Sequence, residues 1–594
     1  MLERLAVTSQ NKKYGSDYLV DMLNALGFKY APMNPGASFR GLHDSIVNYG
    51  GNKNPKLVLC CHEEIAVAIA SGYFRASGRP LAVLVHDIEG LLHASKAIYD
   101  AFTEREALLI LGGNGPTDIE KRRPGIDWLH TPLIPGLAVR DYVKWDDQPD
   151  GLVSAIEAMI RAYNISITDP PGPVYLSIDA EMQENEAERK IVLPEVRNYP
   201  IPTLGEGDSQ SITETAMSLL EASNPTFVLE RYGRDDKSVA DLVKLVEETG
   251  AAVIDSGQRF NFPSRHPQNL SGHDEEILKQ SDLVVTLGVK DLYFALAKEE
   301  KGHFSRESKY MTRPDCKIVR IDSESITNSS WLSEYGRISP TTKSIVAYEP
   351  TAVARMLKIV TEHSPNSSKA AEDRRSKLGE LTSRQREKWL EAAKSQLNQS
   401  PVTYPALAYA IWEKIRSFDW VLAYPGYTRR GINAWVRQLW DITKFYQYPG
   451  RGGGTGTGIG RAIGAALANP NKFCIDFQPD GDLLYTASSL WTARNLQLPL
   501  LIFVLNNQSY FNDEEHQRSV AQDRGRPVEN RTIGIRFDQP PVDFSALARA
   551  CGLGSIGHPV TNVKDLDEVF EAAIKSIKGR DGAVPFLVDV KVQV

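Results

Sequence analysis

The stretch "KFCIDFQPDGDLLYTASSLWTARNLQLPLLIFVLNN" (residues 472–507) decides how this chain folds. It starts with a short β-rich run that ends at Gln478, continues with a segment at 483–497 that reads as one crossover helix, and closes on the apolar run 498–505. Strand, helix and strand in this order predict a right-handed βαβ unit with two parallel strands. The carboxyl ends of both strands then lie at one edge of the sheet, where open α/β sheets bind ligands.

Two polar side chains follow these strands, Asp480 after the first and Asn507 after the second. Because of the βαβ unit we expect them to lie close together. A carboxylate and an amide oxygen are hard ligands, which suit magnesium or calcium better than zinc. The N–H groups of Gly481 and Asp482 open the helix, and a helix N-terminus favours an anion. A Pro-Asp-Gly sequence is usually only a turn, so the following asparagine pair is what favours a cation site beside a diphosphate.

The composition is that of a globular protein with several domains, since 594 residues exceed one hydrophobic core. A net charge of −7 argues against nucleic acid or an anionic membrane as the main partner. The apolar run 498–505 is too short to span a bilayer, and the stretch 1–15 lacks the apolar core of a signal peptide. The five cysteines form no CxxC pair. We expect a cytoplasmic protein.

Short β-rich runs alternate with helical patterns along the chain, which predicts an α/β fold with parallel sheets. We place three domains at 1–190, 200–360 and 400–594, the last two joined by a polar helix at 367–397. The first and third segments share an order of small-residue helix, turn, strand and polar tip, so they look like distant repeats. We therefore predict three doubly wound parallel-sheet domains.

These features resemble a known superfamily. Asp480 and Asn507 match the thiamine-diphosphate motif of the pyruvate decarboxylase, acetolactate synthase and benzoylformate decarboxylase superfamily, a GDG followed after about thirty residues by NN. The resemblance covers nearly the whole chain, in the order pyrimidine-binding, middle and diphosphate-binding domain, and its details are closest to benzoylformate decarboxylase. It implies thiamine diphosphate and Mg²⁺, the metal held by Asp480, Asn507 and the backbone carbonyl of Ser509. The N–H groups of Gly481 and Asp482 would meet the diphosphate, although Asp482 replaces a small residue of the family.

Further cofactor contacts are implied before this motif. By the resemblance, Thr428 would touch the diphosphate, and Gly453 or Gly454 the aminopyrimidine ring. Thr455 stands where the family has a large apolar residue that props the cofactor in its bent form. Glycine runs alone are weak evidence, so these assignments rest on the resemblance.

The resemblance also implies the residues of the reaction. Thiamine chemistry needs a poorly solvated carboxyl group that shares a proton with the aminopyrimidine. The stretch "CCHEEIAVAIASGYFRASG" (60–78) aligns Glu63 with that residue, while its neighbour Glu64 could equally complement the helix dipole. His86, at the end of the run "LAVLV", matches a histidine beside the substrate that transfers or orients protons.

Four residues are candidates for the substrate pocket. Ala37 follows "NPG", where relatives have a serine, and His93 stands where they commonly have asparagine. Asn512 and His516 lie four residues apart in a polar stretch and could reach a polar substrate from one helical face, or could belong to a solvated face. The polar stretch makes a pocket for phenyl groups alone less favoured.

The resemblance favours non-oxidative decarboxylation of a 2-oxo acid to an aldehyde. The alternatives are an acetolactate-synthase-like carboligase, a lyase acting on a diketone or 2-hydroxyacyl thioester, a catalytically silent relative, and a flavin-dependent oxidase. The middle segment carries no GxGxxG after a strand, so we expect it to be structural. The resemblance further implies a homodimer or homotetramer, in which Glu63 of one chain reaches the cofactor held by another.

Overall fold

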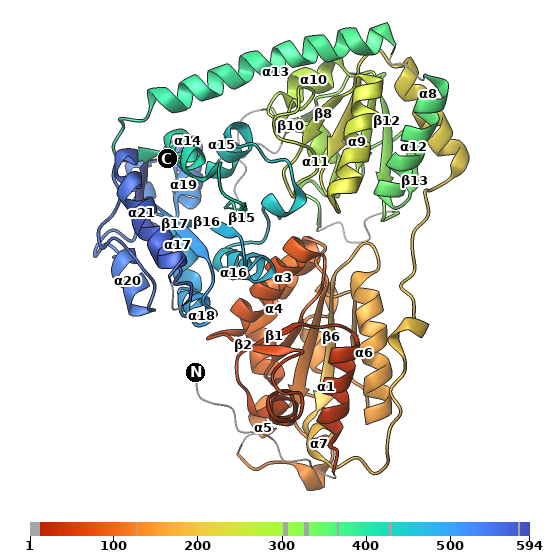
Figure 1. Ribbon diagram of the computed structural model, residues 1–594, viewed down its shortest axis with the longest axis vertical. Helices are drawn as coiled ribbons and strands as arrows, with labels where there is room; N and C mark the ends of the chain where they lie inside the picture. Colours follow the sequence, from red (N-terminus) through yellow and green to blue (C-terminus); the bar gives the residue numbers. More distant parts are fainter. Residues whose placement is uncertain are drawn as a thin grey trace.

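The computed structural model describes residues 12–125, 127–300, 307–325, 332–364, 368–426, 431–579 and 582–593, and within them three parallel sheets (Figure 1). The N-terminal sheet has the strand order β2-β1-β3-β4-β6-β5. Its strands are β1 (Tyr30–Met33), β2 (Lys56–Leu59), β3 (Ala82–Val85), β4 (Leu108–Asn114), β5 (Trp145–Asp147) and β6 (Pro173–Asp179). Its helices are α1 (Gly15–Ala25), α2 (Arg40–Asp44), α3 (Glu63–Ser77), α4 (Asp87–Thr103), α5 (Asp127–His130), α6 (Leu152–Ile167) and α7 (Ala180–Glu184).

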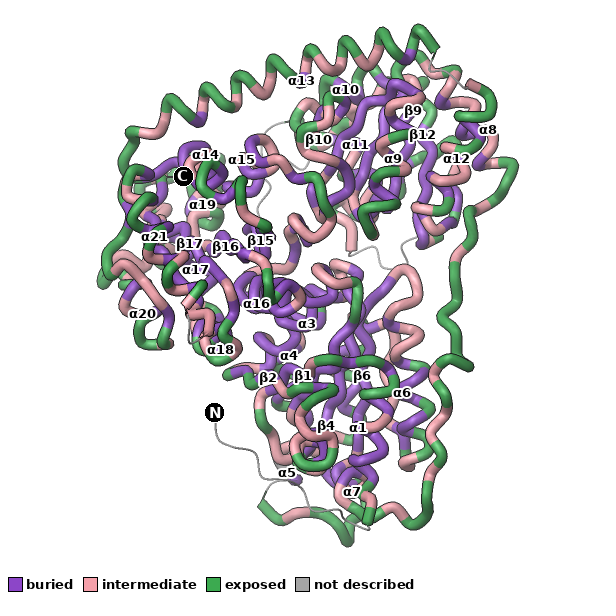
Figure 2. Tube along the Cα trace, viewed as in Figure 1, coloured by how far each residue is buried: buried purple, intermediate pink, exposed green. Residues whose placement is uncertain are grey.

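The middle sheet has the order β13-β12-β9-β7-β8. Its strands are β7 (Pro225–Leu229), β8 (Ala252–Asp255), β9 (Leu283–Leu287), β12 (Lys317–Asp322) and β13 (Lys343–Val346), and a separate antiparallel pair joins β10 (Ala297–Glu299) to β11 (Ser308–Tyr310). The helices are α8 (Ser209–Glu221), α9 (Asp236–Thr249), α10 (Asp274–Gln280), α11 (Leu292–Leu296) and α12 (Glu349–His363). The polar helix expected at 367–397 is α13 (Lys369–Ser395), which runs along the outside to the third sheet (Figures 1 and 2).

The C-terminal sheet has the order β14-β18-β17-β16-β15. Its strands are β14 (Val402–Thr403), β15 (Trp420–Tyr424), β16 (Phe473–Pro479), β17 (Leu500–Asn506) and β18 (Phe586–Gln593). The helices are α14 (Tyr404–Ile415), α15 (Ile432–Leu439), α16 (Gly458–Ala468), α17 (Asp480–Tyr485), α18 (Ser489–Asn495), α19 (Phe511–Asp523), α20 (Phe544–Ala550) and α21 (Leu566–Ile577). The expected βαβ unit is present, with β16 parallel to β17.

Each sheet packs against hydrophobic residues on both faces, because successive side chains of a strand point to opposite faces. Val83 and Val85 of β3 join one core cluster, while Ala82 and Leu84 between them join another on the opposite face. The middle and C-terminal sheets likewise divide their strand residues between two clusters. The predicted fold class, three doubly wound parallel sheets, is therefore confirmed. The domain boundaries stay a prediction.

One expected element is different. The crossover between β16 and β17 was expected as a single helix over 483–497, and the structure divides it into α17 and α18. The break falls near Thr486, whose hydroxyl donates to the carbonyl of Gly456 at 2.6 Å. A tertiary hydrogen bond to a distant loop therefore ends the helix, which local propensity cannot reveal.

The N-terminal and C-terminal domains share one hydrophobic core. It includes Ile69 of α3 and Ile463 of α16, and the two helices pack directly against each other. Small residues permit this approach: a Cβ on Gly460 would lie 2.6 Å from Ala68, and one on Gly464 would overlap the Ile69 carbonyl. These are the small-residue helices that the sequence suggested as counterparts in a repeat.

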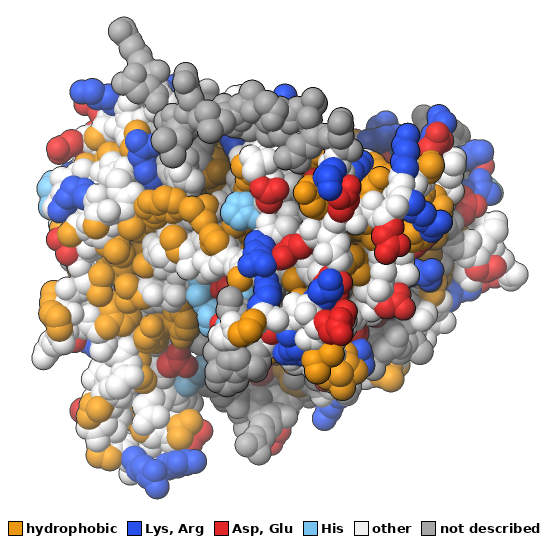
Figure 3. Space-filling model, turned by 90° about the horizontal axis from the view of Figure 1, so that it is seen from below, with side chains coloured by type: hydrophobic (Ala, Val, Ile, Leu, Met, Phe, Trp, Pro, Cys, Tyr) orange, Lys and Arg blue, Asp and Glu red, His pale blue; other side chains and the backbone are white. Residues whose placement is uncertain are grey.

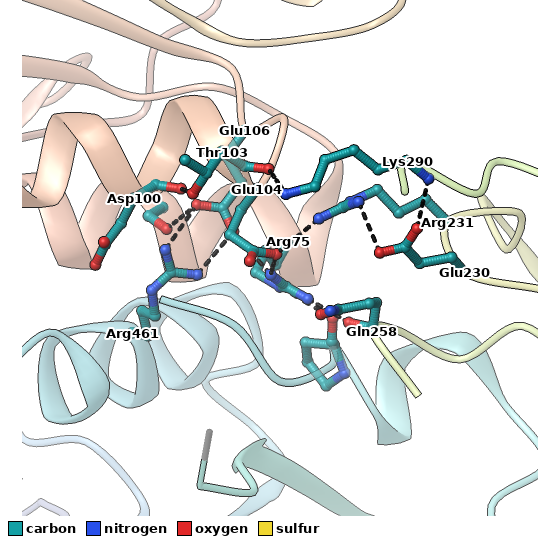
Figure 4. A network of polar contacts seen from close by, with 12 residues as sticks. Arg75, Asp100, Thr103, Glu104, Glu106, Glu230, Arg231, Gln258, Lys290 and Arg461 are labelled. Atoms are coloured by element: carbon teal, nitrogen blue, oxygen red, sulfur yellow. Dashed lines mark hydrogen bonds and ion pairs between the residues drawn. The ribbon is translucent and has the colours of Figure 1, made fainter. Parts of the chain in front are cut away.

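A network of charged side chains reinforces this contact where the three domains meet (Figure 4). Arg461 of α16 donates to both carboxylate oxygens of Glu106 at 2.7 and 3.0 Å. Arg75 of α3 donates to the same carboxylate at 2.9 Å and to the carbonyl of Pro449 at 3.3 Å. The network thus ties α3 to Pro449, which leads into the glycine-rich turn at 450–456.

A second set of ion pairs joins the N-terminal and middle domains. Glu104 lies 3.1 Å from Arg231, just beyond the carboxyl end of β7. Arg105 lies 3.3 Å from Asp322 at the end of β12 and 2.6 Å from Glu324. Charged groups of the N-terminal domain therefore lie at the edge of the middle sheet where an α/β domain would otherwise bind a ligand.

Among the helices within the described ranges, none combines the length and the apolar character that crossing a bilayer requires.

Candidate active site

The carboxyl ends of β16 and β17 bring Asp480 and Asn507 together, as the strand order predicts. Asp480 Oδ2 accepts the N–H groups of Asn507 and Gln508 at 2.9 and 2.6 Å, and its Oδ1 accepts that of Gly481 at 2.8 Å. Burial raises the pKa of Asp480 to about 6, although these N–H groups oppose the shift. A cation at this carboxylate would stabilise its ionised form.

The turn after β17 completes a set of oxygen donors. Asn507 Oδ1 accepts the N–H of Ser509 at 2.9 Å, and the Ser509 hydroxyl donates to Glu514 at 2.9 Å. Glu514 is buried and paired with Arg536 at 2.9 Å, so it holds the turn in place. The side chains of Asp480 and Asn507 and the carbonyl of Ser509 offer oxygen alone, the donor type that Mg²⁺ prefers, so these residues fit the expected metal.

Asp482, the residue that departs from the motif, turns its charge toward the glycine-rich turn. Its carboxylate accepts the N–H of Gly456 and the side-chain amide of Gln478. Burial raises its pKa to about 6. The same burial, with the charge of Asp482 beside it, holds the pKa of Asp476 well above its usual range. Asp482 therefore anchors the turn, which explains a carboxylate at this place.

The turn that would carry the aminopyrimidine is held by the N-terminal domain of the same chain. The N–H of Gly454 donates to Asp100 of α4 at 2.8 Å. Gly453 and Gly456 have φ angles of +80° and +88°, which favour glycine. Thr455 lies half-buried between them. Thr428 is outside the described residues.

The two acids at the start of α3 point in different directions. Glu63 is buried and faces α4, with its Oε2 3.1 Å from His93 Nδ1. Glu64 lies 3.9 Å from Lys96, and a Cβ on Gly456 would lie 3.4 Å from its Oε1. Burial raises the pKa of Glu64. Within one chain, Glu64 thus lies against the glycine-rich turn, and Glu63 lies against the histidines.

His86 is fixed at the start of α4 by its neighbours. Ser38 Oγ lies 2.8 Å from His86 Nδ1 and accepts the N–H of Asp87 at 3.1 Å. A Cβ on Gly36 would overlap the His86 ring, so the "NPG" turn needs its glycine here. Burial, and then the nearby His130, lower the pKa of His86. The imidazole is therefore held in one orientation and favours its neutral form.

Comparison with known proteins agrees with this geometry. Residues 13–133 match the N-terminal TPP binding domain of thiamine pyrophosphate enzymes, and residues 431–590 match their C-terminal TPP binding domain. Both TPP binding domains of the thiamine pyrophosphate enzymes are therefore present in this chain. Thiamine diphosphate is the cofactor for which these two domains are named.

Relatives of this thiamine pyrophosphate enzyme include acetolactate synthases. The probable acetolactate synthase 2 of Oryza sativa subsp. japonica is 25% identical over 98% of this chain and 83% of its own. The acetolactate synthase isozyme 1 large subunit of Escherichia coli strain K12 is 23% identical over 94% of this chain and 93% of its own.

Solved structures show the same fold. A thiamine diphosphate-dependent 4-hydroxybenzoylformate decarboxylase of Rhodococcus jostii RHA1 has a TM-score of 0.75 at 18% identity, covering 98% of this chain and 99% of its own. A benzoylformate decarboxylase of Polynucleobacter necessarius has a TM-score of 0.75 at 17% identity over the same shares.

The remaining pocket candidates of this thiamine pyrophosphate enzyme lie in two places. The carbonyl of Ala37 accepts from Arg123 at 3.1 Å, and the hydroxyl of the next residue, Ser38, contacts His86. The side chain of His93 is 58% exposed and stacks on His62. On α19, Asn512 is exposed and His516 lies 3.7 Å from Asp513 of the same helix. The roles of all these residues stay predictions.

Sequence reasoning missed several residues of the site. Glu514 supports the Asn507 turn, Asp100 holds Gly454, and His130 lies with its ring centroid 5.0 Å from that of His86. Ser38, directly beside Ala37, was visible in the sequence. Glu514 lies in the polar stretch after Asn507, whereas Asp100 and His130 come from segments without a motif, and only tertiary packing brings these two to the site.

Proposed function

We propose that this thiamine pyrophosphate enzyme uses thiamine diphosphate and Mg²⁺ to decarboxylate a 2-oxo acid and release an aldehyde. When bound, the cofactor supplies a nucleophilic carbon and accepts electrons from the bond that breaks. The observation that carries the proposal is the fixed imidazole of His86 beside buried Glu63. Release of an aldehyde requires a proton at the former carboxyl-bearing carbon, and an oriented imidazole can donate it.

The chain's own residues divide the remaining tasks. Asp480, Asn507 and the Ser509 carbonyl would hold Mg²⁺, and the N–H groups of Gly481 and Asp482 would meet the diphosphate. Glu63 would share a proton with the aminopyrimidine. Its low exposure supports this role, because the surrounding protein largely excludes water from the carboxyl group.

We further propose that each site lies between two chains of a homodimer or homotetramer. Within one chain Glu63 contacts α4, and the glycine-rich turn is already contacted by Glu64 and Asp100. Figure 3 supports an interface. On the surface seen from below, hydrophobic side chains gather in one area, and histidines lie at its border. Exposed apolar residues come from both halves of the site, including Leu92 on α4, 58% exposed, and Trp491 on α18, 38% exposed.

A mixing experiment tests the shared site. Chains with Glu63→Gln and chains with Asp480→Asn should each be inactive. Co-expressed and purified together, they should recover about a quarter of the wild-type activity, because half of the dimers are mixed and each of these has one intact site. No recovery, with mixed dimers verified by two affinity tags, would place both residues of a site on one chain. Light scattering that shows only monomer with bound cofactor would also refute the assembly.

The reaction is tested with a panel of 2-oxo acids in the presence of thiamine diphosphate and Mg²⁺, following CO₂ and aldehyde. Glu63→Gln should lower kcat at least about 100-fold, while Glu64→Gln, the matched control, should keep its kcat when thiamine diphosphate is saturating. If Glu64→Gln abolishes activity and Glu63→Gln does not, the assignment of the two acids is reversed. If Glu63→Gln changes no measurable property, the chain is a silent relative.

A second candidate is carboligation, which the acetolactate synthase relatives favour. Detection of a coupled hydroxyketone in place of free aldehyde would identify it. We keep a structural role for the middle domain, supported by the ion pairs of Glu104 and Arg105 at its sheet edge. Flavin absorbance in the purified protein would contradict that role. A cytoplasmic location remains a proposal that rests on composition alone.

A further inference from the structure

His86, Glu89 and His130 form a cluster of metal-ligating side chains beside the site. One ligand atom from each residue can be chosen so that all three lie within 4.8 Å of one another. His86 and Glu89 lie one turn apart at the start of α4, and His130 comes from the end of α5. His130 Nδ1 lies 3.3 Å from Glu89 Oε2. Two separate elements thus bring two imidazoles and one carboxylate to one place.

The hydrogen bonds within this cluster leave histidine nitrogens available to bind a metal ion. Ser38 Oγ holds Nδ1 of His86 at 2.8 Å, which leaves the other ring nitrogen for a second partner. A metal-bound histidine usually donates its other ring N–H to a neighbouring acceptor, and the Ser38 hydroxyl oxygen can accept it. His130 Nδ1 is buried, and it forms no well-aligned hydrogen bond within the described residues, although the Glu89 carboxylate lies 3.3 Å away. A metal ion between the two would satisfy this nitrogen better than the present contact does.

We propose that His86, Glu89 and His130 bind a divalent transition metal ion of the zinc type. Imidazole nitrogens with one carboxylate suit Zn²⁺ or Co²⁺, whereas the all-oxygen set at Asp480 suits Mg²⁺. Tetrahedral coordination at about 2.0–2.1 Å places ligand atoms about 3.3 Å apart, so the cluster must contract. Glu89, with 56% of its side chain exposed, can move to close it. Water would fill the fourth position.

A neighbouring cluster, His62, Glu63 and His93, is less suited to an ion. Its two rings are stacked, with centroids 4.8 Å and planes 25° apart. Histidine binds metal through lone pairs that lie in the ring plane, so two stacked rings aim them past each other. His62 Nδ1 also accepts the N–H of Glu64 and thereby caps α3. The rings of His86 and His130 are tilted by 52° and can converge.

Occupation of the site would withdraw His86 from proton transfer, so Zn²⁺ would inhibit the enzyme. This consequence rests on the proposed function, whereas metal binding itself does not. The zinc site would therefore be an inhibitory site that differs from the magnesium site and shares His86 with the proposed reaction.

The test is metal titration of the full-length protein with thiamine diphosphate and Mg²⁺ in excess. Calorimetry should find one Zn²⁺ per chain, and Co²⁺ should give the intense visible absorption of tetrahedral coordination. His130→Gln and Glu89→Gln should weaken binding by about 10–100-fold. His93→Gln, the matched control from the neighbouring cluster, should leave the affinity unchanged. Circular dichroism verifies that each variant is folded.

The outcomes separate the two proposals. Unchanged zinc affinity in both His130→Gln and Glu89→Gln, or an equal loss in His93→Gln, overturns the site. In an active enzyme, micromolar Zn²⁺ should inhibit the wild type and lose potency by the same factor in Glu89→Gln. Zinc binding without inhibition leaves the metal site standing and contradicts the role of His86 in the reaction.

Discussion

Neutralising Glu106 tests what holds the N-terminal and C-terminal domains together. Its side chain is 0% exposed and is shared by Arg461, 3% exposed, and Arg75, 5% exposed. The Ser71 hydroxyl also donates to it. Glu106→Gln keeps the shape of the side chain and removes the charge. Two buried guanidinium groups then lose the anion between them, and Arg75 keeps only the longer pair with Glu104 at 3.3 Å.

The expected loss of stability depends on how many buried charges each change leaves without their partner. Breaking a buried ion pair by removing one partner costs about 3–5 kcal/mol, because the remaining charge stays buried. Glu106→Gln belongs at the upper end, since two cations are affected. Arg461→Met should cost about 2–3 kcal/mol, because Glu106 keeps Arg75 and Ser71 as partners and the new side chain is apolar. Glu106→Gln should therefore lower the free energy of unfolding clearly more than Arg461→Met does.

Scanning calorimetry measures the difference. For a unit of 150–250 residues, Tm shifts by about 2–4 °C per kcal/mol, so Glu106→Gln should lower it by about 10–20 °C and Arg461→Met by about 4–12 °C. Lys237→Ala, which removes an exposed pair with Asp241, is the control and should change Tm by about 2 °C or less. A loss for Glu106→Gln no larger than that for Arg461→Met would refute the reasoning, because the shared anion would then not be the critical group.

Three further changes test other parts of the structure. Burial raises the pKa of Glu349 to about 7, so the folded chain holds a proton that the unfolded chain releases, and stability falls as pH rises from about 4.5 to 7. Glu349→Gln should flatten the fall in Tm between about pH 5 and pH 7.5. Gly464→Val should lower the free energy of unfolding by at least about 1–3 kcal/mol in urea titrations, since a Cβ there meets the Ile69 carbonyl. Ser38→Ala frees the His86 ring and should lower kcat about tenfold without changing the thiamine diphosphate affinity measured by fluorescence quenching; an equal loss of affinity would contradict a role confined to His86.

Much of the fold could be predicted because the signal is local. The run "LPLLIFVL" is long enough for a strand covered on both faces, and the structure has β17 at Leu500–Asn506. The polar stretch 367–397 lacks strand character and becomes α13. The meeting of Asp480 and Asn507 followed from strand order alone, because parallel neighbours end at the same edge.

The rest depends on contacts between segments far apart in the sequence. The split of the predicted crossover helix arises from a hydrogen bond between Thr486 and Gly456. The place of Asp482 depends on the same turn, which lies 26 residues earlier. No motif marks His130, because it lies at the end of the short helix α5 and meets His86 only through tertiary packing. Sequence periodicity specifies where elements begin, and long-range packing decides what their side chains meet.

The acidic pair at the start of α3 shows how local helix geometry and long-range packing act together. Consecutive helical residues point about 100° apart, so Glu63 and Glu64 cannot serve the same surface. Glu64 lies against the glycine-rich turn of its own chain, which Asp100 and Asp482 also hold. In the proposed assembly, Glu63 of the partner subunit would approach that turn from another side. One helix end would then position the turn in its own chain and serve the cofactor in the other, so a change at Glu64 should weaken cofactor binding while a change at Glu63 should stop the reaction.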